Sequence, residues 1–362
     1  MVTNVPIRCR LAGRFQRVNA RLLLNVVVAL GPATGAIGAP LNIVAVGDSY
    51  TAGSGLTPYA PGTDTPDNRC RRSTRAYPFA LAASLSTSGT PATAVSVACT
   101  GARARNVGFL DADGAHITGE AQFSAAPVQL LTGRVDATTD VVVVSIGGND
   151  AGFTDVLTQC ADPARGSCAA GTLPADLEAR VRRLRASLES TFSAVQRLAP
   201  NATVVAVGYP HPFAPEDMQR PGCSSLAISV PLPLTGRSDQ FVLFDGAERA
   251  FMNRASDWLD ETIAAAATAT GAVMVDPRDV WRGHEVCGSG TPWLAGITGS
   301  GGRVRVARWG TRKLPGIGLP VPAPARWEIQ LVGTGAFHPT VAGMRDGYAA
   351  SIRRAIEASL VR

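Results

Sequence analysis

Four short stretches of the sequence hold residue types that together could cleave a carboxylic ester. Such cleavage needs a nucleophile, a base that removes its proton, and donors for the oxyanion that forms. The candidates are Ser49 in Gly47-Asp48-Ser49, Gly101 in Ala98-Cys99-Thr100-Gly101, Asn149 in Gly147-Gly148-Asn149, and His338 in Phe337-His338-Pro339.

Ser49 comes shortly after an apolar run at residues 42–46, which predicts a buried strand. Ligands of an open α/β sheet bind at the carboxyl ends of its strands, so a nucleophile is well placed there. A serine at this position can also simply cap a helix, and Gly-Asp-Ser alone is weak evidence. The chain contains no Gly-x-Ser-x-Gly, which sets aside the nucleophile elbow of the α/β-hydrolases.

Asn149 and Gly101 are candidate oxyanion donors. Asn149 follows the apolar run 141–146 after two glycines, which let the backbone turn tightly. Gly101 follows the run 94–98, and without a side chain its NH could approach a substrate closely. The alternative for each is a plain turn, so these residues carry weight only together with the other two stretches.

His338 is the candidate base among four histidines. It precedes a proline and a predicted final helix, which favours a loop position. His116 and His211 lie in polar segments, and His284, close to Cys287, is the rival candidate. We favour a structural role for His284.

The order and context of these four stretches resemble the SGNH (GDSL-type) hydrolases. The resemblance is sharp over some 40 residues around the stretches and extends loosely to residues 40–362. It implies acyl transfer in which Ser49 attacks, His338 takes the proton, and the oxyanion is held by the NH groups of Ser49 and Gly101 and by the Asn149 side chain. Neither a metal nor an organic cofactor is expected.

The sequence departs from the common family pattern three residues before the histidine. Many members have aspartate there, whereas this chain has Gly335. Some secreted bacterial members use a backbone carbonyl instead, so we expect the carbonyl of Gly335 or Ala336 to orient His338 in a Ser-His dyad. A remote aspartate, either Asp48, Asp150 or Asp346, remains the alternative.

The elements around these residues predict an α/β fold, a three-layer αβα sandwich with a central parallel sheet of about five strands, as in SGNH and flavodoxin-like proteins. Apolar runs at 42–46, 94–98, 141–146, 203–207 and 273–275 alternate with helical patterns at 77–85, 175–198, 245–267 and 341–361. Residues 39–362 are expected to form one domain. A Gly/Pro-rich but apolar loop at about 282–335 is interpreted as a wall or lid, with a surface excursion as the alternative.

Residues 1–38 resemble an export signal. Five arginines and no acidic residue accompany a short apolar run and a small-residue segment. These arginines account for most of the net charge of +6, which removes the argument for nucleic acid binding. We therefore expect a secreted, extracellular protein, and a monomer. A disordered or anchoring arm is the alternative for this segment.

Six cysteines follow the predicted signal, and sequence alone allows 15 pairings. No spacing typical of a zinc site occurs. The SGNH resemblance implies three local disulfides, which are Cys70–Cys99, Cys160–Cys168 and Cys223–Cys287.

The predicted function is hydrolysis of carboxylic esters, with lipid or fatty acyl esters favoured by the apolar segment 282–335. That segment also suggests transient contact with a lipid surface. An acetylesterase acting on carbohydrate or a phospholipase would use the same residues. A non-catalytic binding protein of this fold is the alternative from another class, and a peptidase is less favoured.

Overall fold

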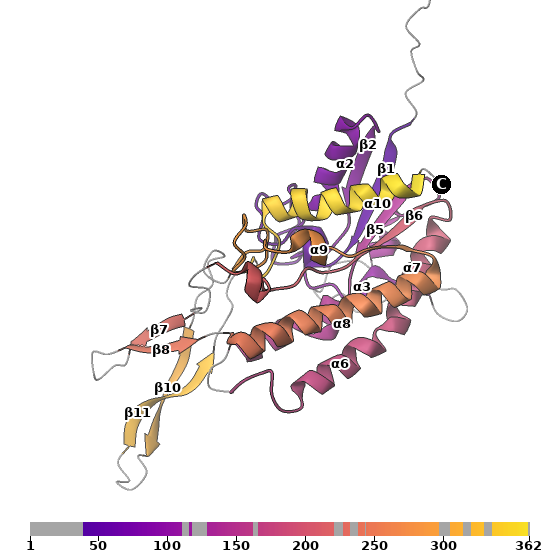
Figure 1. Ribbon diagram of the computed structural model, residues 1–362. Coiled ribbons are helices and arrows are strands. Elements are labelled where there is room, and N and C mark those ends of the chain that lie inside the picture. The colour runs from indigo at the N-terminus through magenta and orange to yellow at the C-terminus, as the bar shows by residue number, and fades with distance from the viewer. Residues whose placement is uncertain are drawn as a thin grey trace, which may run out of the picture. The chain divides into compact units, whose positions relative to one another are not determined.

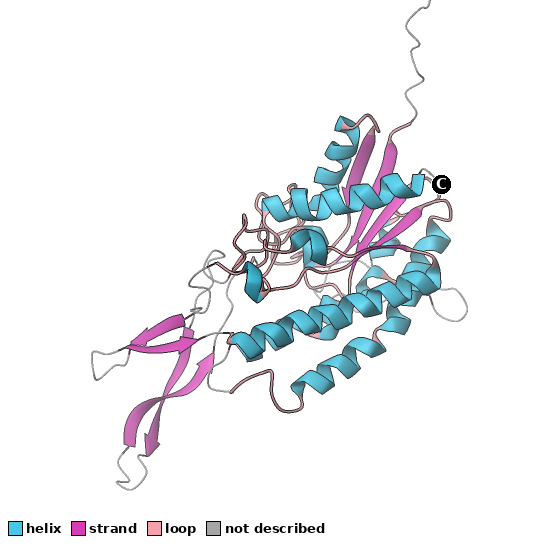
Figure 2. Ribbon diagram, in the orientation of Figure 1, coloured by secondary structure: helices cyan, strands magenta, loops and turns pink. Residues whose placement is uncertain are grey.

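The computed structural model describes residues 39–110, 116–117, 129–161, 166–220, 227–231, 238–242, 244–296, 305–313, 320–328 and 335–360. The predicted signal at 1–38 lies outside these residues. In the described part of the chain, helices cover both faces of a five-stranded parallel sheet (Figure 1), which confirms the predicted fold class. Figure 2 separates the helices and strands by colour.

The central sheet has the strand order β2-β1-β5-β6-β9. Its strands are β1 (Leu41–Gly47), β2 (Ala92–Ser96), β5 (Val141–Ser145), β6 (Thr203–Val207) and β9 (Val273–Val275). The chain passes from β1 to the β2 side and then crosses to β5, so the order reverses between β1 and β5. Ligands of open α/β sheets bind at such a point.

β-branched residues explain the centre of this sheet. β5 has the sequence VVVVS and is buried at every position, as expected for a parallel strand covered on both faces. The predicted bounds are correct for β6 and β9, and wrong by two residues at both ends of β2.

Two groups of helices form the outer layers (Figure 1). One layer holds α2 (Tyr77–Thr87), α9 (Arg278–Trp281), the π-helix η5 (Gly343–Ala349) and α10 (Ala350–Leu360). The other holds α3 (Ala104–Val107), α6 (Leu173–Arg183), α7 (Arg185–Leu198) and α8 (Gly246–Thr270). Shorter elements in the connections are α1 (Ser49–Ala52), η1 (Gln129–Thr132), α4 (Gly148–Ala151), α5 (Phe153–Cys160) and η3 (Glu216–Met218).

The helix predicted at 175–198 is two helices, α6 and α7, which meet at Leu184. Leu184 keeps right-handed helical dihedral angles (φ −70°, ψ −20°). The helical hydrogen bonding is therefore interrupted locally, while the backbone stays in the helical region. No glycine or proline at this position predicted the interruption.

The first part of the predicted closing helix contains the π-helix η5, and Trp281 packs tightly against it. A Cβ atom at Gly347 would lie 2.5 Å from the Trp281 side chain, and one at Gly343 would lie 2.3 Å from the carbonyl oxygen of Trp293. The two glycines make room for this fully buried indole. The wider turn is the kind of local adjustment that π-helices provide.

The prediction of an irregular loop over the whole of 282–335 is wrong for two segments. β10 (Arg305–Lys313) and β11 (Pro320–Glu328) pair in antiparallel fashion as a two-stranded sheet. Pro320, Pro322 and Pro324 recur at every second position of β11. Because alternate residues of a strand direct their NH groups to opposite edges, the intervening residues stay free to donate to β10.

Two other antiparallel pairs complete the described strands. They are β3 (Phe109–Leu110) with β4 (His116–Ile117), and β7 (Ala227–Pro231) with β8 (Ser238–Val242).

Disulfides join Cys70 to Cys99 and Cys160 to Cys168, as the resemblance to SGNH hydrolases implied. Cys223 lies outside the described residues, so the pair Cys223–Cys287 stays a prediction. None of the helices in the described ranges combines the length and the apolar character needed to cross a membrane.

Candidate active site

Ser49 follows the carboxyl end of β1 after a tight turn at Gly47 and Asp48. Gly47 has a φ of +142°, and a Cβ atom there would lie 2.2 Å from the carbonyl oxygen of Ser145 on β5. Only glycine fits this close approach. Asp48 caps α1 by accepting from the NH of Tyr50 at 2.9 Å, which makes Ser49 the first residue of that helix.

Gln129, which lies in η1, binds the backbone of Gly47 in the same turn. The sequence did not indicate this role. Its Nε2 donates to the Gly47 carbonyl at 2.8 Å, and its Oε1 accepts from the Gly47 NH at 2.7 Å. This side chain is 1% exposed, so the paired amide contacts form away from water.

The structure brings His338 to Ser49 across 289 residues of sequence. The Nε2 atom of His338 lies 2.8 Å from the Ser49 Oγ, and its Nδ1 lies 2.8 Å from the carbonyl oxygen of Ala336. A carbonyl can only accept, so Nδ1 carries the proton and Nε2 is the acceptor facing Ser49. The Gly335 carbonyl instead accepts from the backbone NH of His338.

The three carboxylates considered as alternatives make other contacts. Asp48 accepts from the Tyr209 hydroxyl at 2.6 Å, Asp150 accepts from the NH of Ala104 at 3.0 Å, and Asp346 pairs with Arg345. Ala336 is the Nδ1 partner found in the described part of the chain.

Asn149 and Gly101 lie beside Ser49 in one pocket. The Asn149 Nδ2 donates to the carbonyl of Ala102 at 2.9 Å, which fixes the amide plane and leaves a second NH to donate. Gly101 has a φ of +79°, which favours glycine. Among described residues, the NH groups of Ser49 and Gly101 donate to no protein acceptor.

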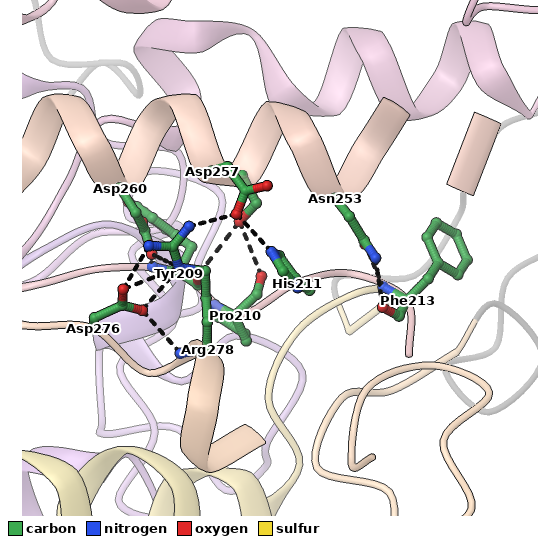
Figure 3. Close-up of polar contacts among 10 residues, drawn as sticks. Tyr209, Pro210, His211, Phe213, Asn253, Asp257, Asp260, Asp276 and Arg278 are labelled. Atoms are coloured by element: carbon green, nitrogen blue, oxygen red, sulfur yellow. Dashed lines mark hydrogen bonds and ion pairs between the residues drawn. The ribbon is translucent and has the colours of Figure 1, made fainter. Parts of the chain in front are cut away.

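A loop at 209–213 forms another wall of this pocket, and α8 holds it (Figure 3). The NH of Tyr209 donates to Asp260 at 2.9 Å, His211 bonds to Asp257 at 2.8 Å, and Asn253 bonds to both backbone groups of Phe213. Sequence reasoning missed these residues. Their signal is a polar stripe on α8, where Asn253, Asp257 and Asp260 recur at helical spacing.

Arg278 links the acidic residues of this network. It pairs with Asp276 at 2.6 Å, contacts Asp257, and lies 3.6 Å from the buried Asp260 (Figure 3). Burial nevertheless raises the pKa of Asp260 well above its ordinary value. The network therefore ties the end of β9 and α8 to the loop that follows β6.

Burial also sets the protonation of the residues next to Ser49. It lowers the pKa of His338, and the bond to the Ala336 carbonyl offsets only part of that effect. A lowered pKa favours the neutral imidazole, the form that can accept a proton. Burial raises the pKa of Asp48 to about 7, against the opposing hydrogen bonds from Tyr209 and Tyr50.

The pocket over Ser49 has a volume of about 240 Å³. Its apolar lining comes from α5, the 209–213 loop, α8 and the segment before His338; the side chains are Phe153, Leu157, Pro210, Pro212, Leu259 and Phe337. Such a cavity, with a few convergent polar groups, is suited to an ester that carries an apolar part.

His284, the rival histidine, lies away from this pocket's lining. Its ring stacks on Trp293 with centroids 3.8 Å apart, and its Nδ1 contacts the carbonyl of Thr291 at 2.7 Å. His211 lies in the α8 network, and the side chain of His116 is outside the described part. No group of three His, Cys, Asp or Glu side chains in the described ranges is arranged to hold a metal ion.

Comparisons with known proteins agree with this geometry. The model of the GDSL-like lipase/acylhydrolase family matches residues 45–345. Lipase 1 of Streptomyces coelicolor is 33% identical over 255 residues, which cover 70% of this chain and 75% of that protein.

Two crystal structures share the fold. The extracellular lipase of Streptomyces rimosus has a TM-score of 0.57 at 27% identity, covering 87% of this chain and 99% of that one. Phospholipase A1 of Streptomyces albidoflavus NA297 has a TM-score of 0.54 at 27% identity, covering 88% and 100% respectively.

Replacing Asp48 with asparagine should weaken the dependence of stability on pH. The raised pKa of Asp48 means that the folded state holds a proton which the unfolded chain has lost above about pH 4. This contribution is full below that pH and is lost as the pH rises to about 7. We expect the wild-type free energy of unfolding to fall over this window by on the order of a few kcal/mol more than that of Asp48→Asn.

Urea unfolding at several pH values between 4.5 and 7.5 measures this difference. Asp346→Asn is the matched control, because the Asp346 side chain is 41% exposed and its pKa is lowered by Arg345. Equal slopes in the wild type and Asp48→Asn would contradict the burial argument.

Proposed function

Because the chain belongs to the GDSL-like lipase/acylhydrolase family, we propose that it is a carboxylic ester hydrolase in which Ser49 is the nucleophile and His338 the base. The observation that carries this proposal is the continuous chain from the Ser49 Oγ through both nitrogens of His338 to the Ala336 carbonyl, with 2.8 Å at each contact. The relatives named lipase support the same reaction class.

In the proposed mechanism, Ser49 attacks the ester carbonyl while the His338 Nε2 takes its proton. The oxyanion receives hydrogen bonds from the NH groups of Ser49 and Gly101 and from the Asn149 amide. His338 then protonates the departing alcohol, and the acyl group remains on Ser49. Water activated by His338 hydrolyses this acyl-enzyme and restores the hydroxyl.

A Ser-His dyad fits this arrangement better than a triad. The Ala336 carbonyl fixes the tautomer of His338 as a carboxylate would. Being neutral, the carbonyl stabilises the imidazolium less than a charged partner does. Burial lowers the pKa of His338, which adds to the cost of forming the imidazolium, so the mechanism relies on the oxyanion donors as well.

The substrate is proposed to be a lipid or fatty acyl ester. The apolar lining of the pocket, which includes Phe153, Leu157 and Leu259, offers a surface for an acyl chain in the same pocket as Ser49. One relative of the same fold is named a phospholipase A1, which is consistent with an acyl ester of a lipid.

Secretion also belongs to this proposal. Residues 1–38 have the composition of an export signal, and one relative is described as an extracellular lipase. Disulfides such as Cys70–Cys99 are typical of proteins in oxidising compartments. We keep the monomeric state, the transient contact with a lipid surface and the covering role of segment 282–335 as predictions.

Ser49→Ala tests the proposed function directly. Without the nucleophile, kcat for ester hydrolysis should fall by about 10⁶-fold. A fluorophosphonate should label the wild type once, at Ser49, and leave the variant unlabelled. Ser351→Ala, which removes another buried serine hydroxyl bonded to Gly347, is the control and should keep labelling and turnover. Unchanged turnover in Ser49→Ala would remove this residue from the mechanism.

The pH profile should report the lowered pKa of His338. Protonated imidazole cannot accept the Ser49 proton, so activity is lost as the pH falls through this pKa. Because burial holds the pKa below the ordinary value of about 6.5, the acidic limb of kcat/KM should lie below pH 6.5. A limb at or above that pH would contradict a buried, neutral base.

Leu157→Trp should shorten the preferred acyl chain. The larger ring would fill part of the pocket that Leu157 lines, whereas Leu157→Ala should admit chains at least as long as the wild type does. Rates on p-nitrophenyl esters from acetate to palmitate measure this, and the palmitate-to-acetate ratio should fall about tenfold or more in Leu157→Trp. A wild-type preference for acetate would argue instead for an acetylesterase.

A further inference from the structure

A single hydrogen bond joins the residue after Ser49 to the residue before His338. The Tyr50 hydroxyl donates to the carbonyl oxygen of Phe337 at 2.6 Å, across 287 residues of sequence. Tyr50 belongs to α1, whose first residue is Ser49, and Phe337 is covalently linked to His338. The contact therefore connects the helix of the nucleophile with the loop of the base.

The accepting carbonyl belongs to a backbone segment that needs support. Phe337 has a φ of +54°, in the left-handed region that is unfavourable for residues other than glycine. Its ring packs edge-on against Phe213 and Phe244, at centroid distances of 5.4 and 5.7 Å. Its NH donates to the carbonyl of Ala295 at 2.8 Å, and the Tyr50 hydroxyl occupies the remaining backbone group.

Tyr50 is itself rigidly held. Its ring meets Tyr209 and Tyr348 edge-on at 5.1 and 6.4 Å, and lies 5.2 Å from the His338 ring. Burial, followed by the nearby Asp48, raises the pKa of the Tyr50 phenol well above its ordinary value. The raised pKa keeps the hydroxyl protonated at neutral pH, so it can donate to Phe337.

The geometry of the base makes this bond important. With a carboxylate partner, an ion pair would draw the imidazolium into place. Here the Nδ1 partner is the backbone carbonyl of Ala336, so the position of His338 follows the backbone at 336–338. A displacement of about 1 Å between reacting groups can cost on the order of 10²-fold in rate.

We propose that Tyr50 is a positioning residue for catalysis, which acts through the Phe337 carbonyl to hold His338 at hydrogen-bond distance from Ser49. This inference rests on the proposed function, because it concerns the same pair of residues. The hydroxyl of Tyr50 serves in place of the anchoring that an acidic partner of His338 would provide.

Tyr50→Phe tests the inference, because it removes the hydroxyl and keeps the ring. Sites competent for acylation are counted with a fluorophosphonate, so that kcat refers to folded enzyme. We expect kcat per site to fall about 10- to 100-fold, with KM within about twofold of the wild type, since substrate binding does not use this bond. The rate of phosphonylation should fall with kcat.

Tyr77→Phe is the matched control. The Tyr77 hydroxyl also bonds to α1, at the Thr51 Oγ1 at 3.0 Å, and its ring also contacts Tyr348. It does not contact the loop before His338 in the described structure, so kcat per site should stay within about twofold. Melting temperatures of both variants record any loss of stability, which changes the number of active sites but not kcat per site.

Two results would overturn the inference while leaving the proposed function intact. One is a kcat per site in Tyr50→Phe that equals the wild-type value. The other is a loss of kcat per site in Tyr77→Phe as large as that in Tyr50→Phe. A wild-type protein that hydrolyses no ester and takes up no phosphonate would instead contradict the proposed function itself.

Discussion

The close approach of β1 to β5 at Gly47 is the constraint on which the site depends. Its missing side chain lets the Ser145 carbonyl lie where a Cβ atom would otherwise be, and Gln129 binds both of its backbone groups. These contacts fix the direction in which the chain leaves β1. Asp48 then caps α1, and Ser49 takes the first helical position. A larger residue at position 47 would displace Ser49, although it would not alter the catalytic side chains themselves.

Buried polar contacts extend this constraint across the carboxyl edge of the sheet. Asp48 accepts from the Tyr209 hydroxyl, the Tyr209 NH donates to Asp260, and Asp260 lies beside Arg278. These residues follow β1, β6 and β9 or lie on α8, so one network joins the ends of several strands. Figure 3 shows the part of it that includes Tyr209, Asp260 and Arg278. A buried polar network in a low-dielectric interior specifies one arrangement more sharply than apolar packing alone.

The sequence was sufficient for the number and order of the strands along the chain, although not for the bounds of β2, because most of them are short valine-rich runs. It also indicated four stretches that the structure brings to one pocket, because each stands at a strand end or beside a helix. It could not show where α6 ends, since Leu184 is no helix breaker, nor that Gly343 and Gly347 accommodate Trp281 in a π-helix. The roles of Gln129 and Tyr50 were also hidden, because each depends on a partner far away in sequence. The carbonyl partner of His338 could be narrowed to two residues only, since backbone direction decides between them.

The prolines of β11 have a consequence for the behaviour of the protein in solution. An unpaired strand edge exposes a row of donors and acceptors that can recruit a strand from another molecule. Pro320, Pro322 and Pro324 all place their missing NH groups on the edge that faces away from β10. That edge offers few donors to a strand of another molecule, so edge-to-edge pairing at β11 is disfavoured.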